Sequence, residues 1–290
     1  MNVAPDAPKR PALRYYGGKW RLAPWIISHF PAHKNYVEPC GGAASVLLQK
    51  PRSPLETDND LDGNVVNFFR VLRDQPDELI RKIRLTPWAR AEFNIAWKKM
   101  NHHDPVEWAR RFAVFQWMSL VSAISHDSPG CRMQKKGNMM GCSSVQMDYE
   151  EIFSAISNRF CGVQIENQPC KKVIAEYDNV DCLIYLDPPY VAETRDINNL
   201  GGRTCYAFEW TNDDHADYAE LLRNAAGYVV VSGYACPLYT ELYEAHGWHR
   251  VDKEAQTNSG GKRIESLWLS PRTWKALQDQ HDDLPLFATA

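Results

Sequence analysis

The stretch LIYLDPPYV, from Leu183 to Val191, joins a short apolar run to an acid, two prolines and an aromatic ring. A run this short that stops at a pair of prolines is typical of a β-strand buried on both faces. Asp187 then stands at the carboxyl end of the predicted strand. Open α/β sheets bind ligands at this edge. An ordinary strand before a Pro-Pro turn has the same pattern, so the interpretation depends on the other motifs.

The composition is that of an ordinary globular protein. The chain has 290 residues, 44% hydrophobic and 24% charged, enough to bury a core in one large domain or in one domain with an insertion. No apolar run approaches the ~18 residues of a membrane span, and the first residues lack the apolar region of a signal peptide. The cysteines form no CxxC pair, which argues against a zinc site or a disulfide framework. We therefore expect a cytoplasmic protein that binds neither membrane nor metal.

The charge is unevenly distributed along the chain. The formal net charge is −3, yet residues 70–147 contain 13 Lys or Arg and 7 Asp or Glu, a balance of +6. A basic segment is typical of a surface that contacts phosphates, although a solvated helical face would give the same balance.

Strands and helices are predicted to alternate at both ends of the chain. YVEPCGGAASVLLQK (36–50) predicts a strand end, a glycine turn and a helix, and SPLETDNDLDGN (53–64) predicts a strand that gives way to a helix over 65–74. Further strands are predicted at 161–167, 182–186, 227–234 and, as an antiparallel edge, 262–270, with a helix at 213–225.

The middle of the chain predicts helices only. DELIRKI, ARAEFNIAWKKM and VEWARRFAVFQWMSLVSAI (106–124) have helical spacing, and the aromatic residues of the last segment are core candidates. A polar loop follows, in which four residues suit phosphates and base edges: Arg132, Lys135, Lys136 and Asn138. We therefore predict a discontinuous α/β domain (1–72 and 157–275), a helical insertion (73–156) and a frayed tail (276–290).

Four motifs in a fixed order carry a family resemblance. These are RYYGGKW (14–20), YVEPCGGAA (36–44), NDLDGNVVNFF (59–69) and DPPY (187–190), with the helical block before the last. In this order they resemble the Dam-type (D12) DNA adenine-N6 methyltransferases. The resemblance implies a Rossmann-like S-adenosylmethionine-dependent methyltransferase sheet with an inserted helical target-recognition domain. It also implies double-stranded DNA as the partner.

The resemblance assigns roles to individual residues. The catalytic residues would be Asp187, Pro188, Pro189 and Tyr190. The S-adenosylmethionine site would contain Tyr15, Tyr16, Gly17, Gly18, Lys19, Glu38, Pro39, Gly41, Asp60 and Asp187. Contacts with DNA would come from Arg132, Lys135, Lys136 and Asn138.

The chemistry explains why these residue types are needed. The N6 amine of adenine is a poor nucleophile because its lone pair is delocalised, and acceptors for its hydrogens would free that pair. In the family, the equivalents of the Asp187 carboxylate and the Pro188 carbonyl are these acceptors. The base must leave the duplex, and Tyr190 offers it a ring face. The sulfonium already activates the methyl group, so neither a metal nor a nucleophilic Cys40 is needed, and S-adenosyl-L-homocysteine is the product.

Two assignments compete with simpler interpretations. Lys19 matches a position suited to the methionine carboxylate, but without the neighbouring YYGG it would be an ordinary surface lysine. Asp60 lies 22 residues after Glu38, close to the ~20-residue separation of a ribose-binding acid. Asp60 is also a candidate N-cap for the next helix, although Asp62 or Asn64 would serve equally.

Three later segments resemble the family less sharply. FEWTNDDHADYAELL (208–222) resembles a loop and helix that close over the site. VVVSGY (229–234) resembles the next strand, with Ser232 expected near the pocket. NSGGKRIESLWLS (258–270) resembles a terminal motif in which a Lys or Arg is expected to contact DNA. The polar loop lacks the Asn- and Arg-rich sequence of the family members that recognise GATC, so we do not predict GATC recognition for this protein.

Other functions remain open at this stage. A methyltransferase of RNA or of protein glutamine would share the DPPY loop, and an inactive DNA-binding module would have damaged cofactor motifs, which this sequence does not show. A dehydrogenase is disfavoured because EPCGGAA lacks the GxGxxG spacing. We expect a stand-alone bacterial enzyme, phage- or prophage-encoded in the simplest case, that is a monomer or weak dimer.

Overall fold

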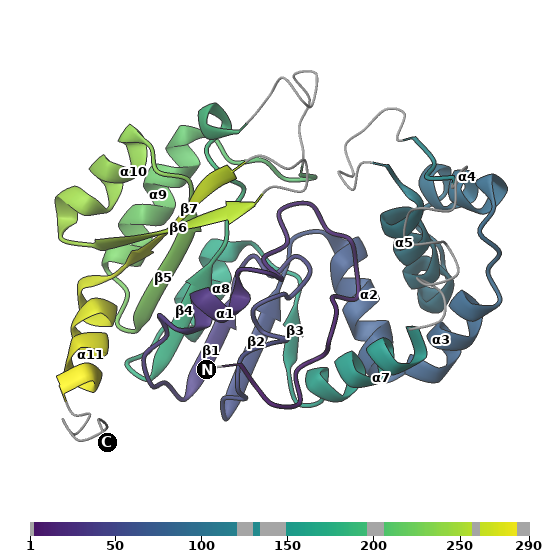
Figure 1. The fold of residues 1–290 in the computed structure, drawn as a ribbon, viewed down its shortest axis with the longest axis horizontal. Helices are drawn as coiled ribbons and strands as arrows, with labels where there is room; N and C mark the ends of the chain where they lie inside the picture. The colour runs from purple at the N-terminus through teal and green to yellow at the C-terminus, as the bar shows by residue number, and fades with distance from the viewer. Residues whose placement is uncertain (1–2, 121–129, 134–148, 196–205, 257–261, 283–290) are drawn as a thin grey trace.

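The structure is a computed structural model that describes residues 3–120, 130–133, 149–195, 206–256 and 262–282. A seven-stranded sheet forms its centre, with the strand order β3-β2-β1-β4-β5-β7-β6 (Figure 1). The strands are β1 (Asn35–Glu38), β2 (Leu55–Asn59), β3 (Gln164–Glu166), β4 (Cys182–Leu186), β5 (Tyr228–Gly233), β6 (His249–Gln256) and β7 (Lys262–Leu269). β7 is antiparallel to β5 and β6, and the other neighbouring pairs are parallel. The predicted α/β class is confirmed.

The edge of the sheet differs from the prediction. KRIESLWLS forms an antiparallel strand as predicted, but the edge position is wrong because β7 lies between β5 and β6. The sequence predicts no strand over the edge strand β6, because the charged residues in its sequence HRVDKEAQ hide any alternation of apolar residues. Charged side chains suit an edge strand because they discourage pairing with a second sheet.

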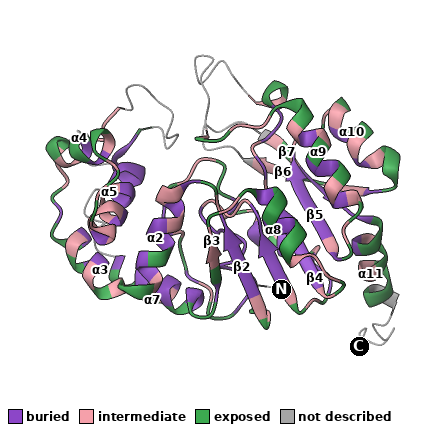
Figure 2. Cartoon of the chain, turned by 180° about the vertical axis from the view of Figure 1, so that it is seen from behind, coloured by how far each residue is buried: buried purple, intermediate pink, exposed green. Residues whose placement is uncertain are grey.

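β4 is buried along its whole length because a hydrophobic core lies on each of its faces. Leu183 and Tyr185 belong to one core, and Cys182, Ile184 and Leu186 belong to the other. This is the alternation expected of a strand that is covered on both sides. The first core also contains residues of α1 and α2, and the second contains residues of α8, α9 and α10, which Figure 2 shows from behind.

The helices flank the sheet and build a lobe beside it. They are α1 (Ala23–Ile27), α2 (Gly63–Asp74), α3 (Pro76–Arg84), α4 (Arg90–Lys98), α5 (Pro105–Met118), α7 (Tyr149–Phe160), α8 (Cys170–Tyr177), α9 (Asn212–Arg223), α10 (Pro237–Leu242) and α11 (Pro271–Asp282), with short 3₁₀ segments η1 (Ala192–Thr194) and η3 (Glu244–His246). None of the helices in the described ranges is long and apolar enough to cross a membrane.

The helix predicted directly after β1 is wrong. Residues 42–49 form successive turns. Gly42 and Ala44 adopt positive φ angles of 52° and 51°, in the left-handed region that a right-handed helix excludes. The backbone therefore stays irregular where it borders the carboxyl edge of the sheet.

Two helix ends also differ from the prediction. The helix predicted over 106–124 ends at Met118, and Ser119 is already extended. Part of the predicted frayed tail, 276–290, is helical, because α11 continues to Asp282. The remainder of that tail lies outside the described residues.

The helical block shares the first core with the sheet. Phe68 of α2 packs against Phe112 of α5 and Phe153 of α7, and all three belong to the core that contains Leu183 of β4. Figure 1 shows α3, α4 and α5 as a lobe to one side, with α2 and α7 next to the sheet. The predicted boundaries of the insertion fall inside α2 and α7. Target recognition by this lobe stays a prediction.

Candidate active site

A pocket lies at the carboxyl ends of β1, β2 and β4. The strand order reverses here, because the chain passes from β1 to β2 on one side while β4 lies on the other. Open α/β sheets bind ligands at such a switch point. The pocket contains about 950 Å³ of empty space, part of it open to solvent. The predicted site residues that line it are Tyr15, Tyr16, Gly17, Gly18, Lys19, Glu38, Gly41, Asp60, Asp187 and Pro189.

Three predicted residues are not among those that line the pocket: Pro39, Pro188 and Tyr190. The Pro39 carbonyl accepts hydrogen bonds from Asn59 Nδ2 at 2.7 Å and Cys170 Sγ at 3.1 Å, which fixes the turn after β1. The ring of Tyr190 is only 6% exposed. Pro39 and Tyr190 therefore shape the loops that carry the pocket.

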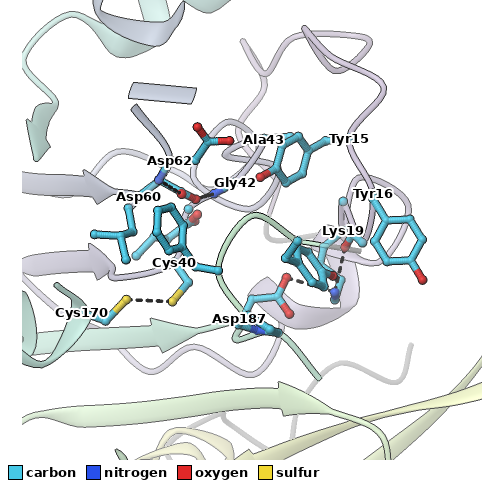
Figure 3. Close-up of a pocket in the computed structure, with 18 of the residues that line it drawn as sticks. Tyr15, Tyr16, Lys19, Cys40, Gly42, Ala43, Asp60, Asp62, Cys170 and Asp187 are labelled. Carbon is cyan, nitrogen blue, oxygen red and sulfur yellow. Dashed lines mark hydrogen bonds and ion pairs between the residues drawn. The ribbon is translucent and has the colours of Figure 1, made fainter. Parts of the chain in front are cut away.

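The Asp187 carboxylate follows β4 and is held from two sides, of which Figure 3 shows the contact with Lys19. Ser232 Oγ donates to Oδ1 at 3.0 Å, and Lys19 Nζ lies 3.0 Å from Oδ2. Ser232 also bonds with the Tyr185 hydroxyl at 2.8 Å, and Lys19 donates to the Gly17 carbonyl at 2.8 Å. The Asp187 side chain keeps 20% of its surface exposed. The acid is thus fixed in orientation while it still faces a cavity.

Lys19 is buried with Asp187 rather than solvated. Its ammonium lies 4.6 Å from the centre of the Tyr190 ring. Burial lowers the pKa of Lys19, but the charges of Asp187 and Glu265 outweigh that effect and raise it above its usual value. Gly17 and Asp187 occupy two of the three N–H groups of the ammonium, so at most one is left for a ligand. The surface-lysine interpretation is wrong.

β1 and β2 place two acids beside each other, since Glu38 pairs with Asp58 in the parallel register. The Tyr36 hydroxyl donates to Glu38 Oε1 at 2.6 Å. Burial raises the pKa of Glu38 to about 7, and burial together with the Glu38 charge raises the pKa of Asp58 well above its usual range. A Cβ atom on Gly41 would overlap Asp58 Oδ1, so the backbone approaches this pair as closely as it can.

Asp60 lines the pocket from the end of β2. Its Oδ2 accepts from Gly42 N and its Oδ1 accepts from Asp62 N, both at 2.8 Å. Burial raises the pKa of Asp60 to about 6, although the amide bonds favour the carboxylate. Asp62 caps α2 by accepting from Asn64 N at 2.9 Å. The N-cap interpretation of Asp60 is therefore wrong.

Comparison with known proteins identifies the family. The sequence matches the model of the D12 class N6 adenine-specific DNA methyltransferases over residues 15–257. The chain belongs to this family. The resemblance drawn from the motifs is confirmed. The methyltransferase therefore acts on the N6 amine of adenine in DNA, as its family does.

Named relatives of the methyltransferase agree with this assignment. It is 24% identical over 277 residues to "Type II methyltransferase M1.LlaDCHI" of Lactococcus lactis subsp. cremoris, covering 89% of this chain and 94% of that protein. It is 26% identical over 235 residues to a "DNA adenine methylase" of Vibrio cholerae serotype O1, covering 75% of this chain and 77% of that protein.

Aromatic residues that the predicted site omits form another wall of the methyltransferase pocket. Trp210 stacks on Tyr218 with ring centroids 3.9 Å apart and an interplanar angle of 9°. Both line the pocket together with Phe208 and Tyr206. The segment FEWTNDDHADYAELL, whose family resemblance suggests closure over the site, supplies three of these side chains. The family resemblance of this segment is therefore the sequence signal that could identify these aromatic residues as part of the site.

Ser232 is expected near the pocket from the resemblance of VVVSGY, but the predicted site does not include it. It is 1% exposed and holds Asp187. Leu186 pairs with Val231 in the parallel register of β4 and β5, so the next residues of the two strands lie beside each other. The register of VVVSGY against LIYLD is the signal that identifies Ser232, and a single sequence does not fix it.

Two thiols meet at the pocket wall of the methyltransferase. Cys40 Sγ and Cys170 Sγ lie 3.1 Å apart (Figure 3). The hydrogen bond to Cys170 and burial raise the pKa of Cys40 well above its usual range, so the thiol stays protonated. A protonated thiol is a weak nucleophile. No group of three or more metal-ligating side chains occurs within the described parts of the chain.

Of the predicted DNA contacts, only Arg132 belongs to the described residues; Lys135, Lys136 and Asn138 lie outside them. The backbone N–H of Arg132 donates to the Met118 carbonyl at 2.6 Å, which ties this segment to the end of α5. Arg132 is close enough to Arg14 that its charge, after burial, lowers the pKa of Arg14. Arg14 directly precedes pocket residue Tyr15, so the two segments bring positive charge near the pocket.

Proposed function

We propose that this protein transfers the methyl group of S-adenosylmethionine to the N6 amine of an adenine extruded from double-stranded DNA. The observation that carries the proposal is the orientation of Asp187. Its carboxylate is fixed by Ser232 and Lys19 and yet lines a pocket at the switch point of the sheet. An acid used only for stability would be closed off from any cavity.

The pocket residues fit the chemistry of the proposed cofactor. Asp60 offers carboxylate oxygens whose remaining lone pairs would accept hydrogen bonds from ribose hydroxyls. The Trp210 and Tyr218 rings offer an aromatic wall for a purine, and Lys19 has one N–H for a carboxylate. When bound, S-adenosylmethionine supplies a methyl group already activated by its sulfonium. A molecule with an aromatic, a hydroxylated and a charged part matches these three regions.

The Asp187 side chain and the Pro188 carbonyl would accept hydrogen bonds from the two N–H groups of the adenine amine. This withdraws the nitrogen lone pair from the ring and directs it outward. Ser232 and Lys19 hold the carboxylate before the substrate arrives, so little reorganisation is needed during the reaction. Consecutive prolines contribute no N–H and keep the loop stiff.

The proposed stacking of the extruded base on Tyr190 sets a condition. The ring is 6% exposed, with Lys19 over one face and Tyr234 at a centroid distance of 4.8 Å. A base can stack on Tyr190 only if the loop frees part of that ring. The family's action on DNA favours DNA over RNA, and the positive charges of Arg14 and Arg132 favour a nucleic acid over protein glutamine.

The test is expression in a host without DNA methylation, followed by sequencing that detects modified bases. We expect N6-methyladenine at a recurring sequence context in cells with the intact gene and none in cells with Asp187→Ala. Purified protein should also bind S-adenosylmethionine in calorimetry. If DNA stays unmodified while RNA or protein glutamine is methylated, one of these alternatives is the substrate. If the purified protein does not bind S-adenosylmethionine, the proposal is rejected.

A further inference from the structure

Glu265 is a half-buried acid on β7 that lies beyond the residues matched by the family. It shares the strand face of Leu267 and Leu269, which belong to the first core. The antiparallel register ends with Ser266 opposite Gly233, so Glu265 lies just past the carboxyl end of β5. This is the edge of the sheet that carries the pocket.

The contacts of Glu265 converge on the catalytic loop. The Tyr190 hydroxyl donates to Glu265 Oε2 at 2.9 Å, and Tyr234 forms a side-chain hydrogen bond with the same acid. The Tyr190 and Tyr234 rings meet edge to face, with an interplanar angle of 83°. Lys19 lies over the Tyr190 ring. Tyr190 is therefore held at its hydroxyl, at its edge and on one face.

The charge of Glu265 also belongs to the catalytic cluster. Burial raises its pKa, while the positive charge of Lys19 opposes that shift. Lys19 thus lies between two acids, because it pairs directly with Asp187 and interacts electrostatically with Glu265. An acid used only to balance charge would not need to accept the hydroxyl of the loop tyrosine.

We infer that Glu265 is a positioning residue for methyl transfer, which acts through the Tyr190 hydroxyl to hold the ring and its loop in place. This inference rests on the proposed function and adds a residue to it. Removing one partner of a partly buried hydrogen bond leaves the other without its acceptor. The Tyr190 ring would then sample other orientations, and the acceptors of the same loop would be aligned for a smaller fraction of the time.

The test compares Glu265→Ala, Glu265→Gln, Tyr190→Phe and the double variant Glu265→Ala/Tyr190→Phe. Single-turnover methyl transfer is measured at the DNA site found by sequencing, and Glu241→Ala, an exposed acid on α10, is the matched control. We expect Glu265→Ala and Tyr190→Phe each to lose about tenfold in rate. Glu265→Gln should lose about twofold to threefold because its amide oxygen still accepts. The double variant should lose no more than either single variant.

Two further readouts separate positioning from a merely structural role. Affinity for S-adenosylmethionine should stay at the wild-type value and the melting temperature should fall by only about 2–6 °C, while fluorescence of 2-aminopurine at the target position should change in Glu265→Ala. A rate within twofold of wild type for Glu265→Ala would overturn the inference. Losses that multiply in the double variant would overturn it as well, since the two residues would then act independently.

A readout without activity keeps this inference distinct from the proposed function. In protein labelled with 3-fluorotyrosine, the Tyr190 signal is assigned by its loss in Tyr190→Phe. We expect Glu265→Ala to shift or broaden that signal. If wild-type protein methylates no DNA, the proposed function fails whatever this signal shows. An unchanged signal in Glu265→Ala rejects the positioning role even if DNA is methylated.

Discussion

Two buried ionic clusters lie at opposite ends of the sheet and differ in one respect. At the amino end of β2, Glu56 pairs with Lys50 and Arg159, whose side chains are 1% and 2% exposed. The three N–H groups of Lys50 Nζ donate hydrogen bonds to Glu56 Oε1, Pro51 O and Ser53 Oγ, at 2.6, 2.7 and 2.8 Å. This cluster is closed.

The cluster at the carboxyl end stays open. Lys19 and Asp187 form a pair of similar length, 3.0 Å, but Asp187 is 20% exposed and lines the pocket. A buried charge is costly, so partners within the protein must offset that cost. Burial alone therefore does not separate a structural acid from a catalytic one. The acid that we propose as catalytic, Asp187, differs from Glu56 in its access to a cavity.

The largest effect is expected at the open cluster. Asp187→Ala should lower the rate of methyl transfer on the order of 10²–10³-fold, because a preoriented group at the reacting atom is lost. The free energy of unfolding should fall by about 1–3 kcal/mol, because buried Lys19 loses its ion-pair partner but keeps the Gly17 carbonyl and the nearby charge of Glu265. Asp181→Ala is the matched control, since Asp181 precedes β4 and forms an exposed ion pair with Lys34. Turnover and urea unfolding are measured for both variants, and substantial residual turnover in Asp187→Ala would contradict the catalytic role.

The closed cluster should respond in the opposite way. Arg159→Ala removes two hydrogen bonds from the buried Glu56 carboxylate, and should lower the free energy of unfolding by about 3–5 kcal/mol. The rate of the folded fraction should remain near that of wild type. Arg90→Ala, at an exposed position of α4, is the control. If Arg159→Ala lost turnover at a temperature where it is fully folded, the division between the two clusters would be wrong.

The pH dependence of cofactor binding probes the open end further. Burial raises the pKa of Asp60 to about 6, so its carboxyl is ionised at pH 8 and becomes protonated as the pH falls below that value. The protonated form is a poorer acceptor for ribose hydroxyls. Calorimetry between pH 5 and 8 should therefore show affinity for S-adenosylmethionine falling about tenfold on acidification through about pH 6.

Substitutions assign this transition. Asp60→Asn should bind weakly and lose the step near pH 6. A second step near pH 7 would belong to Glu38, whose pKa burial raises to about 7, and Glu38→Gln should remove it. A step near pH 6 that persists in Asp60→Asn would place the titrating group elsewhere.

The like charges of Arg14 and Arg132 provide the next test. Arg14 and Arg132 repel each other, in contrast to the paired charges of both clusters, and an anion between them would relieve that repulsion. Replacing both by Ala should weaken DNA binding about tenfold and lower the slope of log K against log salt by about 2, since two phosphate contacts are lost. An unchanged slope in salt titrations would mean that DNA binds elsewhere.

The sequence predicts the open cluster better than the closed one. Asp187, Lys19 and Asp60 occur in motifs, and a strand end at the carboxyl edge of a parallel sheet already indicates a site. Arg159 lies 103 residues from Glu56 and belongs to no motif, so only the tertiary position of α7 brings it to Glu56 and Lys50. Pairing between side chains that are far apart in the sequence is not fixed by local pattern.

The same limit explains the fold predictions. The predictions of β4 and α2 are confirmed because a continuous apolar run and a helical spacing of apolar residues are local signals. The polar edge strand β6 and the turns at 42–49 depend on neighbouring elements, so their sequences alone predict another structure. The pairing of Lys19 with Asp187, in place of a solvated lysine, likewise requires the three-dimensional arrangement.

The smallest effect is expected for an uncharged pair in the same pocket. Cys40 and Cys170 are close together, but burial and their hydrogen bond keep Cys40 protonated, and methyl transfer needs no covalent intermediate. Cys40→Ser retains a hydrogen-bonding hydroxyl of similar size and should keep turnover within about twofold of wild type. The exposed Cys161→Ser is its control. A loss of methyl-transfer rate approaching that of Asp187→Ala would indicate a catalytic role for the thiol. Uncharged residues that line the pocket would then also be functional.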